Sequence, residues 1–463
     1  MKRLLILLAA MTLLCCCKKD LNDVPYIKSD NPSKIDWKAS YAYVFDSSVI
    51  PEIHLGISTD EWNRLLQAYD KQSSTKEYIA CDVTYIKDGA ERWIPAAGVR
   101  LRGNTSRRRP EGSGGQSHKS NGADWHHCHF SLGLHHYYKN AEHTLYGIRQ
   151  VDLKWFKEDP AYVREIYCYD LFRRFGVWTA INDIYARLWI QVGNDKEAYF
   201  GVYGMLEHID REYIYARAKQ FGSTEGSLWK CSYGADLRRT DNDFGEDDNT
   251  RDHVYELKYS GSEFQQAKTQ IKDFISKLNS LRGDELYGWL ESVIDIDLLL
   301  RTYAVNVAVG MWDDYWNNSN NYYLYFTPEG RMFFIPFDYD NTIGTSHVCG
   351  VQKDSGRQDP YKWGQSSNPL ISTILSKAEW KALYKQYLQE LCGDGGLNSA
   401  EAAKERILEW QSQISSFVPN DTGEDMSISD KPASWGNHPE YRIMAPGTNN
   451  FFTVKAATVA AMK

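Results

Sequence analysis

The chain has 463 residues, which is enough for two or three domains, and its 42% hydrophobic and 25% charged residues are ordinary for a globular protein. A formal net charge of -8 and the lack of a long basic face argue against nucleic acid as a partner. Aromatic residues make up 14% of the chain. They either fill a large core, which we favour, or line a ligand groove.

A targeting segment is predicted at residues 1–17. Two basic residues precede an apolar run, residues 4–14, that is too short to span a bilayer. Three cysteines follow directly, as in the lipobox of bacterial lipoproteins, so Cys16 or Cys17 is the expected site of acylation. Residues 18–40 are polar and predict a tether. We therefore expect an exported lipoprotein of the bacterial cell envelope, held at the outer membrane or cell surface by a lipid anchor, with ordinary secretion as the alternative.

Cysteine and histidine patterns do not favour zinc. The other six cysteines show no CxxC or CxxH spacing, and their disulfide pairing cannot be derived from sequence. Five histidines cluster in one segment without an evident third or fourth ligand, so hydrogen-bonded histidines are favoured over a metal site. These histidines are His126, His127, His129, His135 and His136.

Residues 41–235 alternate short strands with few helices and predict a β-rich region. A Ser-Thr-Asp-Glu sequence at 58–61 predicts the start of a helix. A long loop with glycines and arginines, residues 103–124, separates two predicted strands. We expect strands over 53–57, 78–85, 97–102, 129–134, 183–192 and 198–206, and helices over 161–175 and 210–218.

The second half of the chain predicts helices. Residues 236–262 read as an acidic insertion. Residues 263–463 predict a helical lobe, with an apolar helix over 295–310 and a β-hairpin within 312–344. The chain is therefore predicted to be an α+β protein.

This hairpin carries the clearest candidate site. If Phe326 pairs with Arg331, Asp338 lies opposite Ser319 and beside Asn318, because paired residues of a ladder are about 5 Å apart. Carboxylate and carboxamide oxygens are the ligands that Mg²⁺ and Mn²⁺ prefer. The candidate metal ligands are Asp338, Asp340, Asn318 and Asn321, with Asp313 a few residues away.

A helix, a loop Asp, an Asn, a hairpin and a further Asp also occur in this order in protein kinases. The spacing from Asp313 to Asn318 equals that between the catalytic Asp and the metal-binding Asn of the kinase loop. Two alternatives stay open: these residues cap turns at the hairpin, or Asp313 and Asp338 form the carboxylate pair of a glycoside hydrolase.

Several motifs in order resemble the CotH kinase family, the spore-coat-protein-H-like atypical kinases. The similarity covers VRLRGNTS at 99–106, VREIYCYDLFRRFG at 163–176, YFGVYGMLEHI at 199–209 and GSLWK at 226–230, and it spans about residues 50–420. The resemblance implies an atypical protein-kinase-like fold with a β-rich N-terminal lobe and a helical C-terminal lobe. It also implies ATP as phosphoryl donor, Mg²⁺ or Mn²⁺, and a Ser or Thr hydroxyl of a protein as acceptor.

By position in the family pattern, Asp313 resembles the catalytic Asp and Asp338 the metal-binding Asp. The family Asn matches Asn321, whereas the kinase loop spacing favours Asn318, and we keep both.

The resemblance places the loop that follows Arg102, with Asn104 and Ser106, at the nucleotide. The family usually has a Lys near the next strand, but residues 125–129 contain none. Either Lys119, Lys230 or Arg102 supplies the charge that faces the phosphates, or activity is impaired.

Glu207 resembles an acidic position near the nucleotide, although a surface ion pair explains it almost as well. The alternative function is a non-catalytic surface lipoprotein that binds a glycan or a partner protein, since nucleotide is scarce outside the cytoplasm.

Overall fold

The computed structural model describes residues 31–71, 76–248, 252–345, 354–433 and 440–463. The predicted signal peptide, with Cys16 and Cys17, lies outside the described residues. Helix α1 (Trp37–Val44) begins inside the range predicted as a tether, where Asp36 caps its first turn. None of the described helices is long and apolar enough to cross a bilayer.

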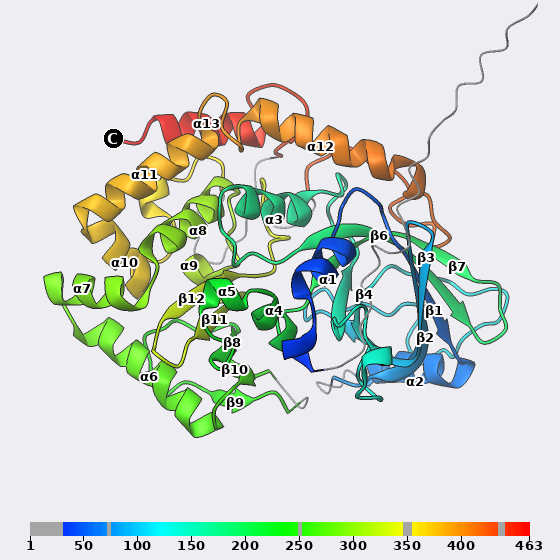
Figure 1. Ribbon diagram of the computed structural model, residues 1–463. Coiled ribbons are helices and arrows are strands. Elements are labelled where there is room, and N and C mark those ends of the chain that lie inside the picture. Colours follow the sequence, from blue (N-terminus) through cyan, green and yellow to red (C-terminus); the bar gives the residue numbers. More distant parts are fainter. Residues whose placement is uncertain (1–30, 72–75, 249–251, 346–353, 434–439) are drawn as a thin grey trace, which may run out of the picture.

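Seven strands of the N-terminal half close into a barrel, which lies on the right in Figure 1. Their order around the barrel is β1-β2-β3-β4-β5-β7-β6, and a parallel pairing of β1 with β6 closes it. Alternate side chains point into an apolar interior, as the period of a strand requires. The strands are β1 (Glu52–Ile57), β2 (Ile79–Lys87), β3 (Ala90–Arg102), β4 (His129–Gly133), β5 (Gln150–Lys154), β6 (Asp183–Val192) and β7 (Ala198–Glu207).

Two of the helices that contact the barrel strands are α2 (Thr59–Asp70) and α3 (Arg164–Arg174). Helix α2 starts where Ser58 accepts a hydrogen bond from the Glu61 amide, as its sequence predicts, and it buries Trp62. Helix α3 joins β5 to β6 and is buried on nearly all sides, because it packs between the barrel and the C-terminal helices (Figure 1). Its first turn carries Glu165.

A second sheet of five strands has the order β12-β11-β8-β10-β9. Two of these strands, β9 and β10, lie within 236–262, so the range expected as an acidic insertion contributes strands to this sheet. The apolar side chains of β10 are buried there, and the acidic residues flank them. The strands are β8 (Ser227–Cys231), β9 (Phe244–Glu246), β10 (Tyr255–Ser260), β11 (Tyr322–Phe326) and β12 (Met332–Pro336).

The register of the β11–β12 hairpin differs by one residue from the predicted register. Phe326 pairs with Met332 rather than with Arg331. Gly330 adopts φ +90°, and the Thr327 amide donates to the Arg331 carbonyl at 2.9 Å, which leaves five residues in the turn. As a result, continuing the ladder places Asp338 opposite Asn320 instead of Ser319.

Helices pack around this second sheet and form a second hydrophobic core with α3. Helix α8 is buried over most of its length. The α+β class and the β-rich N-terminal region followed by helices are confirmed. The helices are α4 (Arg211–Ala216), α5 (Ala218–Phe221), α6 (Phe264–Ser280), α7 (Gly283–Val293), α8 (Ile296–Ala308), α9 (Tyr315–Asn318), α10 (Pro369–Ser376), α11 (Ala378–Cys392), α12 (Ala400–Ile414) and α13 (Phe451–Ala460).

Candidate functional site

A cleft of about 910 Å³ lies between the barrel and the second sheet. It is lined by the end of β3, the loop after it, β5, β8 and the base of the β11–β12 hairpin. Most of the predicted site residues line this cleft, although they come from distant parts of the sequence. They are Arg102, Asn104, Ser106, Lys230, Asp313, Asn318, Asn321, Asp338 and Asp340.

At the centre of the site is a lysine that the sequence analysis missed. Lys154 is the last residue of β5, and its Nζ lies 2.6 Å from Glu165 Oε2 and 2.7 Å from Asp338 Oδ1. A third carboxylate, Asp340 Oδ2, is 3.2 Å away. Alternation along β5 explains the placement, because Val151 and Leu153 enter the barrel core and Lys154 faces the other way. The sequence signal that could have found Lys154 was an alternating strand that ends in a lysine and is followed by a helix with a glutamate in its first turn.

The charges around Lys154 shift the pKa values of Asp338 and Asp340 in opposite directions. Burial alone would raise the pKa of Asp338, but the charges of Lys154 and Arg102 hold it at about 2. Burial also raises the pKa of Asp340. The charge of Lys154 lowers this pKa only in part, and the charge of Asp338 raises it further, to about 7. Burial would lower the pKa of Lys154, yet the surrounding carboxylates raise it and keep the ammonium charged.

The three carboxylates around Lys154 fit a hard divalent cation. Glu165, Asp338 and Asp340 each offer one oxygen within 4.8 Å of the others. The Oδ1 atom of Asp340 is buried without a hydrogen-bond partner among the described residues, so it remains available as a ligand. Carboxylate oxygens are the donors that Mg²⁺ and Mn²⁺ prefer. Of the predicted metal ligands, Asp338 and Asp340 belong to this group, and Glu165 is an addition.

The loop before β11 surrounds Asp313 with carboxamides. Asn318 Nδ2 donates to Asp313 Oδ1 at 2.6 Å, and Asn321 Nδ2 donates to Asp313 Oδ2 at 3.2 Å. Asn320 donates to the same carboxylate at 3.2 Å. Burial and the charge of Asp338 raise the pKa of Asp313 although these hydrogen bonds oppose the shift. The two asparagines predicted as metal ligands are thus hydrogen-bonded to Asp313, and their binding of metal stays a prediction.

The backbone at this end of the hairpin is unusual. Ser319, Asn321 and Asp338 all have φ between +50° and +63°, which non-glycine residues rarely adopt. Such conformations concentrate at functional sites, where surrounding contacts hold them. Here the Asp338 amide donates to the Tyr169 hydroxyl of α3 at 2.9 Å.

Arg102 and the following loop form the barrel side of the cleft. Arg102 Nε lies 3.4 Å from Asp152 Oδ2, and its guanidinium stands 5.7 Å from the centre of the Phe337 ring. Gly103, with φ +104°, starts the loop, and the Arg107 amide donates to the Asn104 carbonyl at 3.3 Å. Lys230 lies across the cleft on β8, 3.5 Å from Asp252.

Contrary to expectation, neither Lys119 nor Glu207 lines the cleft. Glu111 holds the Lys119 segment, because its carboxylate accepts a hydrogen bond from the Lys119 backbone amide at 2.9 Å. Glu207 is 1% exposed and pairs with the buried Arg217 at 2.6 Å, so it is a structural ion pair inside the fold. The ion pair considered for Glu207 is therefore present, but it is buried rather than at the surface as expected.

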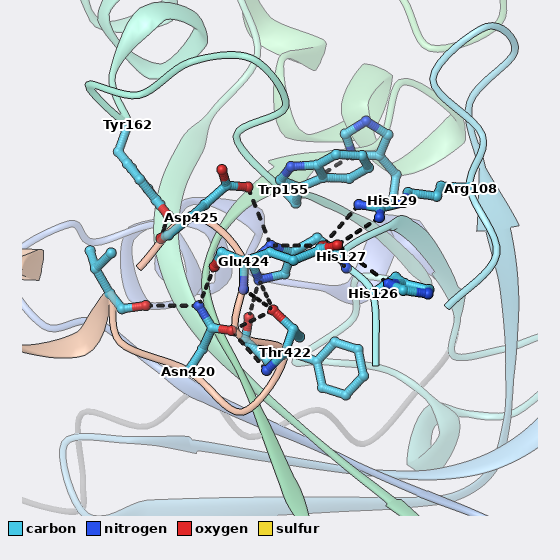
Figure 2. A network of polar contacts seen from close by, with 12 residues as sticks. Arg108, His126, His127, His129, Trp155, Tyr162, Asn420, Thr422, Glu424 and Asp425 are labelled. Atoms are coloured by element: carbon cyan, nitrogen blue, oxygen red, sulfur yellow. Dashed lines mark hydrogen bonds and ion pairs between the residues drawn. The ribbon is translucent and has the colours of Figure 1, made fainter. Parts of the chain in front are cut away.

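Within the histidine segment, His126 and His127 contact an acidic loop (Figure 2), whereas His136 lines the cleft. Glu424 accepts hydrogen bonds from Arg108 Nη1 at 2.8 Å and from the His127 amide at 3.0 Å. His126 Nδ1 lies 3.3 Å from Glu424, and His127 Nδ1 lies 3.4 Å from Asp425. No group of three potential metal ligands among the described residues includes a histidine.

The comparisons with known proteins agree with the resemblance seen in the motifs. The family described as CotH kinase protein matches residues 99–443. No curated protein matches the chain. Because the matched segment contains the end of β3, all strands from β4 to β12, Lys154, Asp313 and Asp338, and covers most of the sequence, this chain belongs to the CotH kinase family.

Proposed function

We propose that this protein is an ATP- and divalent-metal-dependent phosphotransferase that phosphorylates Ser or Thr hydroxyls of a protein substrate. The observation that carries the proposal is the contact of Lys154 with Glu165 on α3 and with Asp338 beyond the hairpin. In protein kinases a strand lysine pairs with a helix glutamate and faces the phosphates, while an Asp after a hairpin binds the metal. Lys154, Asp338 and Asp313, which takes the place of the loop Asp, line this cleft, and Glu165 contacts Lys154 behind it.

Each residue has a defined role in this proposal. Lys154 and Arg102 bind the phosphates of ATP, with Asn104 and Ser106 in the adjoining loop. Asp338, Asp340 and Glu165 hold Mg²⁺ or Mn²⁺, with Asn318 and Asn321 as further candidates. The cation supplies charge neutralisation to the transferred phosphoryl group.

Asp313 orients the acceptor hydroxyl and accepts its proton. Its pKa, raised by burial, suits a general base better than that of an exposed carboxylate. The carboxamides of Asn318 and Asn321 fix the orientation of this carboxylate, because both donate to it.

For location, we propose an exported lipoprotein acylated at Cys16 or Cys17 and attached to the membrane of the bacterial cell envelope. The basic and apolar N-terminal residues before these cysteines support this placement. No nucleic-acid partner is proposed, because the chain is acidic overall.

The test uses two variants and one control. Asp338→Ala is expected to abolish Mg-dependent nucleotide binding, whereas Asp313→Ala retains binding and loses phosphoryl transfer. Asp284→Ala, an exposed position on α7, is the matched control. Transfer of label from γ-³²P-ATP to the protein and to a mixed-protein substrate measures the reaction, and calorimetry measures binding. Full binding and transfer in both cleft variants would exclude the proposal.

A further inference from the structure

A second arginine on β3 faces the cleft, and it has no carboxylate partner among the described residues. Arg100 lies two residues before Arg102 on the same face of β3, and both line the cleft. Its guanidinium donates a hydrogen bond to the Leu101 carbonyl at 3.3 Å and stands 5.3 Å from the centre of the Tyr78 ring. Its Nε atom is buried and makes no hydrogen bond within the part of the chain that the structure describes.

Three other cations of the cleft wall have carboxylate partners. Arg102 is paired with Asp152 at 3.4 Å, and Arg149 with Glu212 at 2.8 Å. Lys154 contacts three carboxylates. Among the described residues, Arg100 has no carboxylate within ion-pair distance.

A second guanidinium lies close to Arg100. The loop after β3 starts at Gly103, which has a positive φ, and Arg107 of this loop also lines the cleft. Burial and the charge of Arg100 together lower the pKa of Arg107. His136 stacks on Tyr78 with ring centres 4.2 Å apart and also lines the cleft.

Two like charges in a partly buried cleft are unfavourable unless an anion neutralises them. Guanidinium groups bind phosphate and carboxylate through paired N–H donors. An uncompensated Nε inside a cleft therefore indicates a ligand rather than a contribution to stability.

We propose that Arg100 and Arg107 form an anion subsite of the cleft that takes an oxyanion group, a phosphate or a carboxylate, from a ligand that also reaches Asp338. This inference rests on the proposed function, because the ligand is either the nucleotide or the acceptor. Two residues of a strand span about 6.6 Å, so Arg100 lies roughly that far beyond Arg102 along β3. A polyphosphate chain or a residue adjacent to the acceptor hydroxyl can cover this distance.

The experiment measures binding without phosphoryl transfer. The full chain and its variants Arg100→Gln, Arg100→Lys and Arg107→Gln are titrated by calorimetry with three probes. The probes are inorganic tripolyphosphate, Mg-ADP, and a peptide with a phosphoserine beside a free serine. Arg331→Gln, an exposed position on the β11–β12 turn, is the control, and circular dichroism checks the fold of each variant.

Arg100→Gln and Arg107→Gln are each expected to weaken binding about tenfold, and Arg100→Lys less, because it keeps the charge but loses the paired donors. Weaker binding of tripolyphosphate and Mg-ADP identifies the nucleotide as the source of the anion. Weaker binding of the phosphopeptide alone identifies the acceptor. Equal affinity of every variant and the control for all three probes overturns the subsite.

The two proposals can fail separately. Arginine-dependent binding of a probe in a protein that transfers no phosphate would uphold the anion subsite and reject the kinase function. Phosphoryl transfer with unchanged affinities in the Arg100 and Arg107 variants would uphold the kinase function and reject the anion subsite.

Discussion

Lys154 Nζ donates to Asp338 Oδ1 at 2.7 Å across 184 residues of sequence. This contact joins the last residue of β5 to the end of the β11–β12 hairpin, and so connects the barrel to the second sheet within the cleft. Because Lys154 also holds Glu165 of α3, one ammonium group sets the positions of three elements.

Replacing Lys154 is expected to affect both stability and nucleotide binding. Lys154→Gln leaves the carboxylates of Glu165, Asp338 and Asp340 without their cation, which lowers the free energy of unfolding by about 3 kcal/mol. Urea denaturation measures this loss, and calorimetry with Mg-ADP measures affinity. Lys219→Gln, on an exposed face outside the cleft, serves as the control. Unchanged stability and affinity in Lys154→Gln would contradict the role given to this residue.

Asp314 is expected to make stability depend on pH. Burial raises the pKa of Asp314 to about 7, and its Oδ2 has no hydrogen-bond partner among the described residues. Between about pH 4 and pH 7 the folded state therefore binds more protons than the unfolded state, and stability falls as pH rises through this range, by up to about 4 kcal/mol.

The variant Asp314→Asn isolates this effect, because Asn can still cap α9 but does not titrate. The stability of the native protein relative to the variant should decrease from pH 4 to pH 7 and level off above pH 7. Urea denaturation at several pH values tests this expectation. A constant difference across the range would show that Asp314 does not titrate there.

Glu207 should matter for folding and not for nucleotide binding. Its pair with Arg217 is buried, so Glu207→Gln leaves a buried guanidinium without its charge partner and costs about 3–5 kcal/mol. The affinity of the folded variant for Mg-ADP should equal that of the native protein. Lost affinity with intact stability would instead restore Glu207 to the nucleotide site.

The acidic loop of Figure 2 should hold the histidine segment in place. Glu424→Ala removes the acceptor for Arg108 and for the His127 amide, at a cost of about 1 kcal/mol because the ion pair is partly exposed. Hydrogen exchange at the His127 amide should become faster. Glu409→Ala, which breaks an exposed pair with Arg406 on α12, is the control and should not change this exchange. Equal exchange rates at His127 in both variants would contradict the role of Glu424.

Local features of the fold could be predicted from the sequence. The start of α2 at Ser58 and the β11–β12 hairpin depend on hydrogen bonds between near neighbours, which short motifs specify. The register of the hairpin was wrong by one residue, because the backbone conformation of Gly330 sets the turn length. Residues 236–262 were predicted to be an insertion because of their acidic charge, although they contain β10, a strand of the second sheet.

By itself the sequence determined the α+β class and the family, since short-range alternation and motif order are encoded locally. It grouped Asn318 and Asn321 with Asp338, whereas in the structure both asparagines donate to Asp313. Only the tertiary structure decided that Lys154 is the cation of the site and that Glu207 is not part of it. The physical reason is that a buried charge is stabilised by partners that folding brings from distant elements, and no local pattern specifies those partners.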